Sequence, residues 1–345
     1  MAHAPLRVVM YGLGAIGIPI ARLIAQQPHL HVVGGIERDP AKIGHDLGTV
    51  IGHPQPLGVR VGADSVQVLR HARPDVVVIA TTSFLRDVFP QIRDCLAVGA
   101  HVVSTCEELV YPAASHPEVA HALDEAAHAA NVVVLGVGIN PGFVMDLLPI
   151  MLTAPSVDIR HVRVERVVDA GTRRASLQHR IGVGLDLVAF RAWVQQRTTP
   201  HIGLRHSLRM IADALGWHLD DVHEHTAPII AEGWHRTPYV TVAPGQVVGI
   251  HQTARGFMHR REVVALDWRT GLGMRDTHDA ILIDGTPPID LVIKNGIHGD
   301  HAAAALVMHA VPVVTALRPG LRTVLDLPVL HYRTPTPAAE RQRGS

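Results

Sequence analysis

Lysine is nearly absent from this sequence of 345 residues, which contains only Lys42 and Lys294. Mechanisms that use a lysine as a Schiff-base nucleophile or as a proton donor are therefore restricted to two positions. Arginine supplies the rest of the 31 basic side chains. Contacts with anionic groups consequently fall to arginine.

The sequence also lacks a net charge and a long hydrophobic run. Basic and acidic side chains both number 31, so the electrostatic field that would attract nucleic acid or an anionic membrane is missing. No apolar stretch approaches the roughly 18 residues that a membrane span needs. With 47% hydrophobic and 18% charged residues, the composition is typical of a soluble globular protein whose partners are small molecules.

Cysteine is rare as well, since the sequence contains only Cys95 and Cys106. These two residues form neither a C-x-x-C pair nor a metal-binding spacing. The 25 histidines include no H-E-x-x-H pattern, so we expect solvated histidines and no metal site. The chain starts directly into its first apolar strand, without the features of a signal peptide. The lack of cysteine pairs and of a signal peptide favours a location in the reducing cytoplasm.

The segments before Gly142 predict an α/β fold. Nearly continuous Val/Ile runs indicate strands that are covered on both faces, as in a doubly wound parallel Rossmann sheet. Helical stretches separate the later strands, around residues 85–98 and 117–130. The five strand segments read LRVVMYG, HVVGGIERD, RPDVVVIATTS, AHVVSTCEE and NVVVLGVGINPG.

The pattern changes after Gly142, where alternating segments such as VRVERVVDAG and EVVALDW favour a second, antiparallel sheet in an α+β domain. Because 345 residues exceed the size of one comfortable core, we expect several parts. They are a dinucleotide-binding domain over 1–141, a substrate and dimerisation domain over 142–300, a segment over 301–333 that packs back on the first domain, and a disordered tail over 334–345.

The strongest motif is Gly12-Leu13-Gly14-Ala15-Ile16-Gly17, which lies between a strand and a helix. In that context its glycines permit a tight turn and close approach to the pyrophosphate of a dinucleotide. Glu37 ends the second strand, where an acid accepts the ribose hydroxyls of NAD. Arg38 follows directly and suits the 2′-phosphate of NADP, unless it belongs to a solvated turn. The cofactor is therefore NAD, NADP or both.

Polar residues follow two later strands. Thr81-Thr82 and Ser104-Thr105 stand at carboxyl ends of strands, where such a sheet meets its ligand, so together they predict a cofactor rim. Each hydroxyl could equally cap a following helix.

Glu107 and Glu108 stand where the fifth strand should end. Hydride transfer alone needs no carboxylate, but an amine substrate must lose a proton and its iminium is positive, so a carboxylate can serve as both base and electrostatic stabiliser. Adjacent residues in extended backbone face opposite ways. We therefore assign catalysis to Glu108 and a capping or supporting role to Glu107; for Glu108 the alternative is an acid at a helix start.

The segments STCEELVYP and GVGINPGFVMD, with RVVDAGTRRASLQHRIGVG and GQVVGIHQTARG further on, resemble the native amine dehydrogenases and 2,4-diaminopentanoate dehydrogenases of the dihydrodipicolinate reductase-like Rossmann families. The resemblance covers nearly the whole chain. It implies reversible reductive amination of a small ketone or aldehyde with ammonia, a homodimer, Glu108 as acid/base, and the phosphate loop at residues 12–17. The histidine pair and catalytic lysine of the reductases proper are missing.

A predicted substrate pocket involves Phe143, Met145 and His309, the last standing where relatives often have asparagine. Asn140 is predicted to contact the nicotinamide, although the Asn140-Pro141-Gly142 segment could be only a hinge and Phe143 and Met145 could belong to the core. Two other functions stay open: a diamine or amino-acid dehydrogenase, and a dinucleotide sensor without turnover.

Overall fold

The structure, a computed structural model, describes residues 4–196 and 202–332. It divides into two compact units, one formed by Met1–Gly138 with Asp300–Ser345 and the other by Ile139–Gly299. The chain thus passes from the first unit to the second and back. The tail predicted over 334–345 lies outside the described residues.

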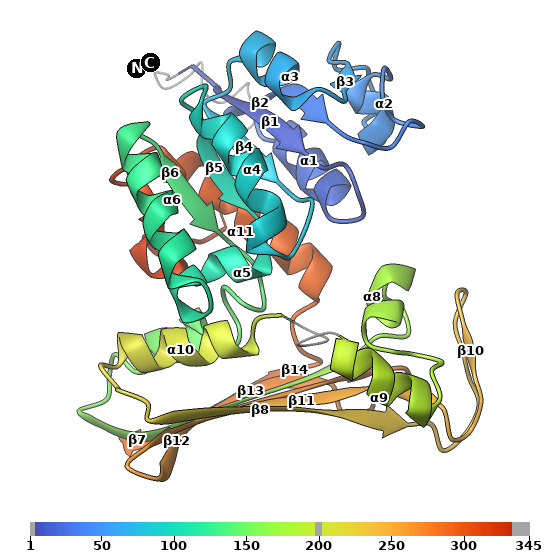
Figure 1. The fold of residues 1–345 in the computed structure, drawn as a ribbon, viewed down its shortest axis with the longest axis vertical. Coiled ribbons are helices and arrows are strands. Elements are labelled where there is room, and N and C mark those ends of the chain that lie inside the picture. The colour runs from blue at the N-terminus through green and yellow to red at the C-terminus, as the bar shows by residue number, and fades with distance from the viewer. Residues whose placement is uncertain (1–3, 197–201, 333–345) are drawn as a thin grey trace, which may run out of the picture. The chain divides into compact units, whose positions relative to one another are not determined.

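The first unit contains a parallel sheet, as predicted, and this sheet has seven strands where five were expected (Figure 1). Its strand order, β15-β6-β5-β4-β1-β2-β3, reverses direction between β1 and β4. In doubly wound sheets, ligands bind beside the carboxyl ends of the strands at such a reversal. The strands are β1 (Leu6–Tyr11), β2 (Leu30–Ile36), β3 (Val61–Gly62), β4 (Val76–Ile79), β5 (His101–Ser104), β6 (Val133–Gly136) and β15 (Gly320–Arg322).

Helices cover this sheet because their apolar residues recur every three or four positions. In α4, for example, Leu85, Val88, Ile92 and Cys95 are all buried. The helices are α1 (Gly17–Ala25), α2 (Leu47–Ile51), α3 (Ser65–Ala72), α4 (Leu85–Leu96), α5 (Glu107–Val110), α6 (Pro117–Ala129) and α11 (Gly299–Val314), with short 3-10 turns η1 (Pro112–Ala114) and η2 (Val324–Asp326).

The second unit contains a six-stranded sheet with the order β14-β13-β7-β12-β11-β8. The expectation of an antiparallel sheet is wrong at one pair of strands, because β7 and β12 pair in parallel, whereas the other neighbouring strands pair antiparallel. The chain leaves β7 through helices and two further long strands before β12, and a connection of that length permits parallel pairing. The strands are β7 (Asp158–Asp169), β8 (Asp221–Ile230), β11 (Val247–Met258), β12 (Arg261–Gly271), β13 (His278–Thr286) and β14 (Ile289–Lys294).

The two faces of this second sheet differ. One face packs against α10, which contacts β11 and β12, and supplies the apolar core of the unit. The remaining elements of the unit are α7 (Leu147–Leu152), α8 (Ala175–Arg180), α9 (Leu187–Gln196), α10 (Leu204–Ala214) and the two-stranded arm of β9 (His235–Arg236) and β10 (Thr241–Val242).

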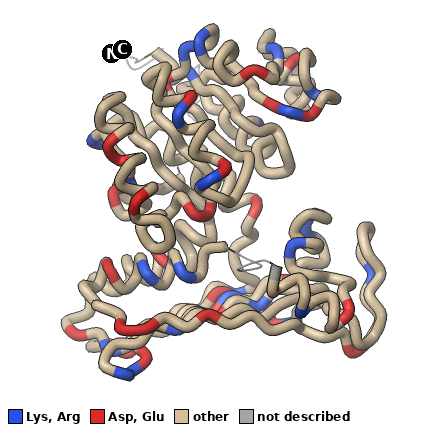
Figure 2. Tube along the Cα trace, viewed as in Figure 1, with Lys and Arg blue, Asp and Glu red and all other residues tan. Residues whose placement is uncertain are grey.

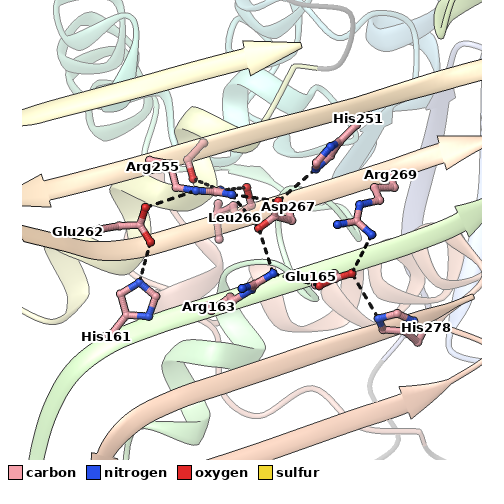
Figure 3. Close-up of polar contacts among 11 residues, drawn as sticks. His161, Arg163, Glu165, His251, Arg255, Glu262, Leu266, Asp267, Arg269 and His278 are labelled. Atoms are coloured by element: carbon pink, nitrogen blue, oxygen red, sulfur yellow. Dashed lines mark hydrogen bonds and ion pairs between the residues drawn. The ribbon is translucent and has the colours of Figure 1, made fainter. Parts of the chain in front are cut away.

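The other face of the sheet carries a network of acids, arginines and histidines (Figure 3). Asp267 is its centre: the Nη2 atom of Arg255 lies 3.0 Å from both carboxylate oxygens, and Nε2 of His251 lies 3.1 Å from Oδ1. Figure 2 shows both signs of charge interspersed along these strands. Partners around it are His161, Arg163, Glu165, Glu262, Arg269 and His278.

This network predicts a specific acid sensitivity. Burial raises the pKa of Asp267, but hydrogen bonds from Arg255 and His251 outweigh it, and the pKa lies below its ordinary value of 3.8. A carboxyl whose pKa is depressed by folding stabilises the protein above its unfolded pKa, and this contribution is lost as the pH falls through the folded pKa. We therefore expect Asp267→Asn to lower stability at neutral pH and to reduce the further loss of stability below about pH 4.

Melting temperature measured across that pH range checks this expectation. Asp290→Asn, which changes an exposed carboxylate on β14, is the matched control and should follow the wild-type curve. Parallel curves for wild type and Asp267→Asn would show that the ion pairs of Asp267 do not contribute to acid stability.

Candidate functional site

The glycine motif forms a tight loop between β1 and α1. Gly12 has a φ of 95°, and a Cβ there would lie 2.6 Å from the carbonyl oxygen of Ala80. A Cβ on Gly17 would lie 1.9 Å from the carbonyl oxygen of Gly12. Around Gly14, by contrast, a Cβ would meet nothing within 4 Å. Two glycines are therefore required by packing, whereas the third keeps space open on the ligand side of the loop.

The other residues of the loop also differ in burial. Leu13 is fully buried and anchors the loop in the core, while Ala15 is exposed and Ile16 is partly exposed at the start of α1. Ile16 supplies no side-chain cap, so the first N–H groups of α1 have no side-chain acceptor from that residue. Such N–H groups are suited to a phosphate.

Glu37 links the end of β2 to this loop. Its Oε2 atom accepts a hydrogen bond from the backbone N–H of Leu13 at 2.7 Å, and its Oε1 atom accepts one from the N–H of Arg38 at 2.7 Å. The carboxylate is thus held at the position predicted for a ribose-binding acid. It also fixes the loop relative to β2.

A cavity of about 580 Å³ opens over these groups. It lies at the reversal between β1 and β4 and is bounded on its far side by the first two turns of α4. Sequence reasoning missed the α4 wall, although the helix starts only three residues after Thr82. The lining residues are Tyr11, Gly12, Gly14, Ile36, Glu37, Arg38, Ala80, Thr81, Thr82, Arg86, Asp87, Pro90 and Gln91.

The four hydroxyl residues predicted at the rim divide into two pairs. Thr81 and Thr82 line the cavity, where Thr81 Oγ1 donates to Gln91 Oε1 at 2.7 Å. Ser104 is fully buried, and its Oγ atom donates to the carbonyl of Ile79 and accepts from the N–H of Cys106. Neither Ser104 nor the partly buried Thr105 belongs to the lining of this cavity. The hydroxyl of Ser104 therefore bonds only to backbone groups of the protein, as the alternative of a local capping role suggested, and does not face the cavity.

The two glutamates form the first turn of the short helix α5, because β5 ends at Ser104. The expectation of extended backbone at this point is therefore wrong, and so is the argument that the two side chains must face opposite ways. In a helix, successive side chains diverge by about 100°. Both residues are partly buried.

The carboxylate of Glu108 is fixed at the start of α4. Its Oε2 atom accepts a hydrogen bond from the N–H of Leu85 at 2.6 Å, where the N-cap residue Phe84 provides no side-chain cap. Nε2 of His116 lies 3.4 Å from the same oxygen, and the side chain of Glu108 is 15% exposed. Within the residues that the structure describes, Oε1 of Glu108 has no hydrogen-bond or ion-pair partner. Glu108 thus has one anchored oxygen and one oxygen without a partner among the described residues, and its side chain does not belong to the lining of the dinucleotide cavity.

In the second unit, Asp146 organises the segment that begins at Asn140. The fully buried Asp146 accepts hydrogen bonds from the N–H of Gly142 at 2.8 Å and from Oγ of Ser207 at 2.7 Å, while burial raises its pKa. Asn140 is 9% exposed, and its Oδ1 atom has no hydrogen-bond partner among the described residues. A buried unsatisfied acceptor in a native protein calls for a missing donor.

The predicted pocket residues lie in different surroundings. Met145 is fully buried in the core of the second unit and Phe143 packs against that core, so both act in packing here. His309 lies on α11 and is partly buried.

The described residues, 4–196 and 202–332, lack two kinds of feature. No group of three or more His, Cys, Asp or Glu side chains there could hold a metal ion. No helix in that part of the chain has the length and hydrophobicity to cross a membrane.

Comparisons with known proteins agree with the motifs. Residues 143–338 match the model of the 2,4-diaminopentanoate dehydrogenase C-terminal domain, and residues 6–107 match that of the dihydrodipicolinate reductase N-terminus. The chain is 31% identical to a 2,4-diaminopentanoate dehydrogenase from Acetoanaerobium sticklandii, over 94% of this chain and 93% of that protein. It is 24% identical to an amine dehydrogenase from Streptomyces virginiae, over 93% and 96% of the two chains.

A solved structure extends this likeness to three dimensions. An amine dehydrogenase from Mycobacterium smegmatis superposes with a TM-score of 0.87 and 27% identity, covering 96% of this chain and 98% of that one. The resemblance noted in the sequence motifs is confirmed. This chain belongs to the 2,4-diaminopentanoate dehydrogenase family.

Proposed function

We propose that this protein is an NAD(P)-dependent amine dehydrogenase that converts a small ketone or aldehyde and ammonia into a primary amine, and the amine back again. The carboxylate of Glu108 carries the proposal. It follows the carboxyl end of β5 and accepts a hydrogen bond from the N–H of Leu85, the first residue of α4, three positions after the cavity residue Thr82. The names of the relatives, which are amine and diaminopentanoate dehydrogenases, support the same reaction class.

The first unit fits a dinucleotide. The open space at Gly14, the anchored carboxylate of Glu37 and the uncapped start of α1 suit the pyrophosphate and ribose of NAD(P). When bound, the dinucleotide supplies or accepts the hydride. The residues of this chain bind it, orient it and manage the protons.

Proton management is assigned to Glu108. During amination, ammonia adds to the carbonyl carbon and water leaves, so protons must move from nitrogen to oxygen before the iminium carbon takes up hydride. A carboxylate can carry those protons and stabilise the positive iminium. The N–H of Leu85 holds Oε2, which leaves Oε1 to face the reacting nitrogen. Asn140, with its unsatisfied Oδ1, is proposed to accept from the nicotinamide amide.

The test is a spectrophotometric screen of NADH and NADPH oxidation against small ketones and aldehydes, with and without ammonium. Oxidation that requires both a carbonyl and ammonium is the expected result. A diamine dehydrogenase, the alternative favoured by the 31% identical relative, would prefer amino-ketones. A dinucleotide sensor would bind NADH but oxidise it with no carbonyl in the panel.

We further propose a homodimer, formed in the cytoplasm. The charged face of the second sheet carries both signs in alternation, with Arg163 and Arg269 beside Glu165 (Figure 3). Such a surface is complementary to a second copy of itself across a twofold axis. Cys95 and Cys106 are buried free thiols, which suits a reducing compartment. Sedimentation of the purified protein tests the dimer.

A further inference from the structure

His116 contacts the same oxygen of Glu108 that the backbone of α4 holds. Its Nε2 atom lies 3.4 Å from Oε2 of Glu108, which accepts the hydrogen bond from the N–H of Leu85. The side chain of His116 is 37% exposed, whereas that of Glu108 is 15% exposed. The pair therefore joins a largely buried carboxylate to an imidazole that reaches solvent.

The backbone holds His116 in this place from both sides. Its N–H donates to the carbonyl of Pro112 at 2.8 Å, and its own carbonyl accepts from the N–H of Ala120 at 2.9 Å. His116 is the N-cap residue of α6, a position whose side chain often bonds to the first turn of the helix. The imidazole makes no such bond. It is directed instead to Glu108, on the separate helix α5.

His116 also lines a cavity of about 310 Å³ between α4 and α6. Of the residues that line the dinucleotide cavity, this second cavity shares only Arg86. Two charged residues accompany His116 in its wall, Arg86 from α4 and Glu118 from α6, and the other lining residues are apolar: Leu85, Phe89, Val119 and Ala122. His116 therefore meets solvent at a cavity separate from the one proposed for the dinucleotide.

The proposed amination consumes a proton from solvent. Ammonium, a carbonyl compound and the reduced dinucleotide give a protonated amine, water and the oxidised dinucleotide only if one further proton is taken up. The hydride goes to carbon, and that proton ends, with those of ammonium, on the amine nitrogen and on the departing oxygen. Bound ligands exclude water from a reacting centre. Glu108 therefore needs a route by which protons reach it from the other side.

We propose that His116 is a proton relay between solvent and Glu108. The imidazolium donates its Nε2 proton to Oε2 of Glu108, and the neutral imidazole then takes a proton from water in the cavity. Pairs separated by a few tenths of an ångström more than a hydrogen bond often tighten when substrate binds. The relay rests on the proposed function, because it acts through Glu108 and serves the same reaction.

Chemical rescue of the intact protein tests the relay. In His116→Ala, kcat for ammonium-dependent oxidation of NADPH should fall by about ten- to a hundredfold, while fluorescence titration should show an unchanged affinity for NADPH. Added imidazole should restore most of the lost rate. The rescue should weaken as the pH rises, because the imidazolium form supplies the proton. The solvent isotope effect on kcat should be larger in His116→Ala than in the wild type, since proton delivery then limits turnover.

Two further variants separate a relay from a positioning role. His116→Gln can still donate a hydrogen bond to Glu108 but cannot carry a proton, so it should lose as much rate as His116→Ala. His121→Ala is the matched control, because His121 on α6 also lies 3.4 Å from a carboxylate, that of Glu125, but is 74% exposed and lines neither cavity. It should keep the wild-type kcat and show no response to imidazole.

A wild-type rate in His116→Gln would overturn the relay and leave only a positioning role. A loss in His116→Ala that imidazole does not restore would overturn it as well. Either result would leave the proposed function intact, provided that the wild type oxidises NADPH or NADH only with both ammonium and a carbonyl compound. A wild-type protein without that turnover would overturn both proposals.

Discussion

Glu108→Gln is expected to lower the kcat of reductive amination by about 10²–10⁴-fold while the protein stays folded and binds its dinucleotide normally. The glutamine oxygen can still accept the hydrogen bond from Leu85 N–H that holds the start of α4. What the substitution removes is the capacity to take up and return a proton, together with the negative charge that stabilises the iminium. Stopped-flow and steady-state oxidation of NADPH with ammonium and a carbonyl substrate measure the loss.

Two glutamine variants serve as controls. Glu118→Gln changes an exposed acid on α6 that makes no hydrogen bond with Glu108 in the described part of the chain, although it lines a cavity of about 310 Å³ together with Leu85 and His116, and it should keep the wild-type rate. Glu107→Gln tests the neighbouring carboxylate, for which a supporting role predicts a smaller loss than at position 108. A wild-type rate in Glu108→Gln would refute the assignment. A severe loss only in Glu107→Gln would transfer the acid/base role to Glu107.

A third variant separates the structural contribution of Glu108 from its chemistry. Glu108→Ala removes the acceptor of Leu85 N–H, and loss of such a cap costs about 0.5–2 kcal/mol. Glu108→Gln keeps an acceptor there and should unfold close to the wild-type temperature. If both variants lost rate equally but only alanine lost stability, capping and catalysis would be two separate functions of one side chain.

The first unit could be predicted from sequence because its signals are local. The glycine loop, the adjacent acid Glu37 and the apolar strands all lie within short stretches whose geometry depends on the residues themselves. The parallel pairing of β7 with β12 could not be predicted, because it joins residues more than a hundred positions apart, such as Val162 and Val264. The alternating pattern of each strand indicates a covered face but does not indicate the direction of its neighbour.

In the candidate site, too, features that depend on neighbouring residues could be predicted, whereas contacts between distant residues could not. Sequence position predicted Glu108 beside a ligand, but it did not indicate that its carboxylate accepts a hydrogen bond from the N–H of Leu85, the first residue of α4. Arg86 was missed because a charged residue in a first helical turn resembles any solvated residue until the cavity beside it is seen. Ser104 was placed at the rim by its position after a strand, whereas the structure turns its hydroxyl to Ile79 and Cys106.

In the glycine loop, two alanine substitutions are expected to have large effects of different kinds: one lowers the stability of the protein and the other weakens cofactor binding. Gly17→Ala would place a Cβ 1.9 Å from the backbone oxygen of Gly12. Neither backbone segment can yield without displacing α1 from β1, so we expect a loss of about 1–3 kcal/mol or more in the free energy of unfolding. Gly14→Ala meets no atom within 4 Å and should change stability by less than about 0.5 kcal/mol.

Gly14→Ala is nevertheless expected to bind NADPH and NADH much more weakly, because its methyl group would occupy the space through which a pyrophosphate approaches the backbone. Thermal unfolding and fluorescence titration of the two variants separate packing from binding. A folded Gly14→Ala protein with wild-type affinity would mean that this loop does not hold the pyrophosphate. Because both cofactors contain the same pyrophosphate, Gly14→Ala should weaken the binding of NADH and of NADPH alike.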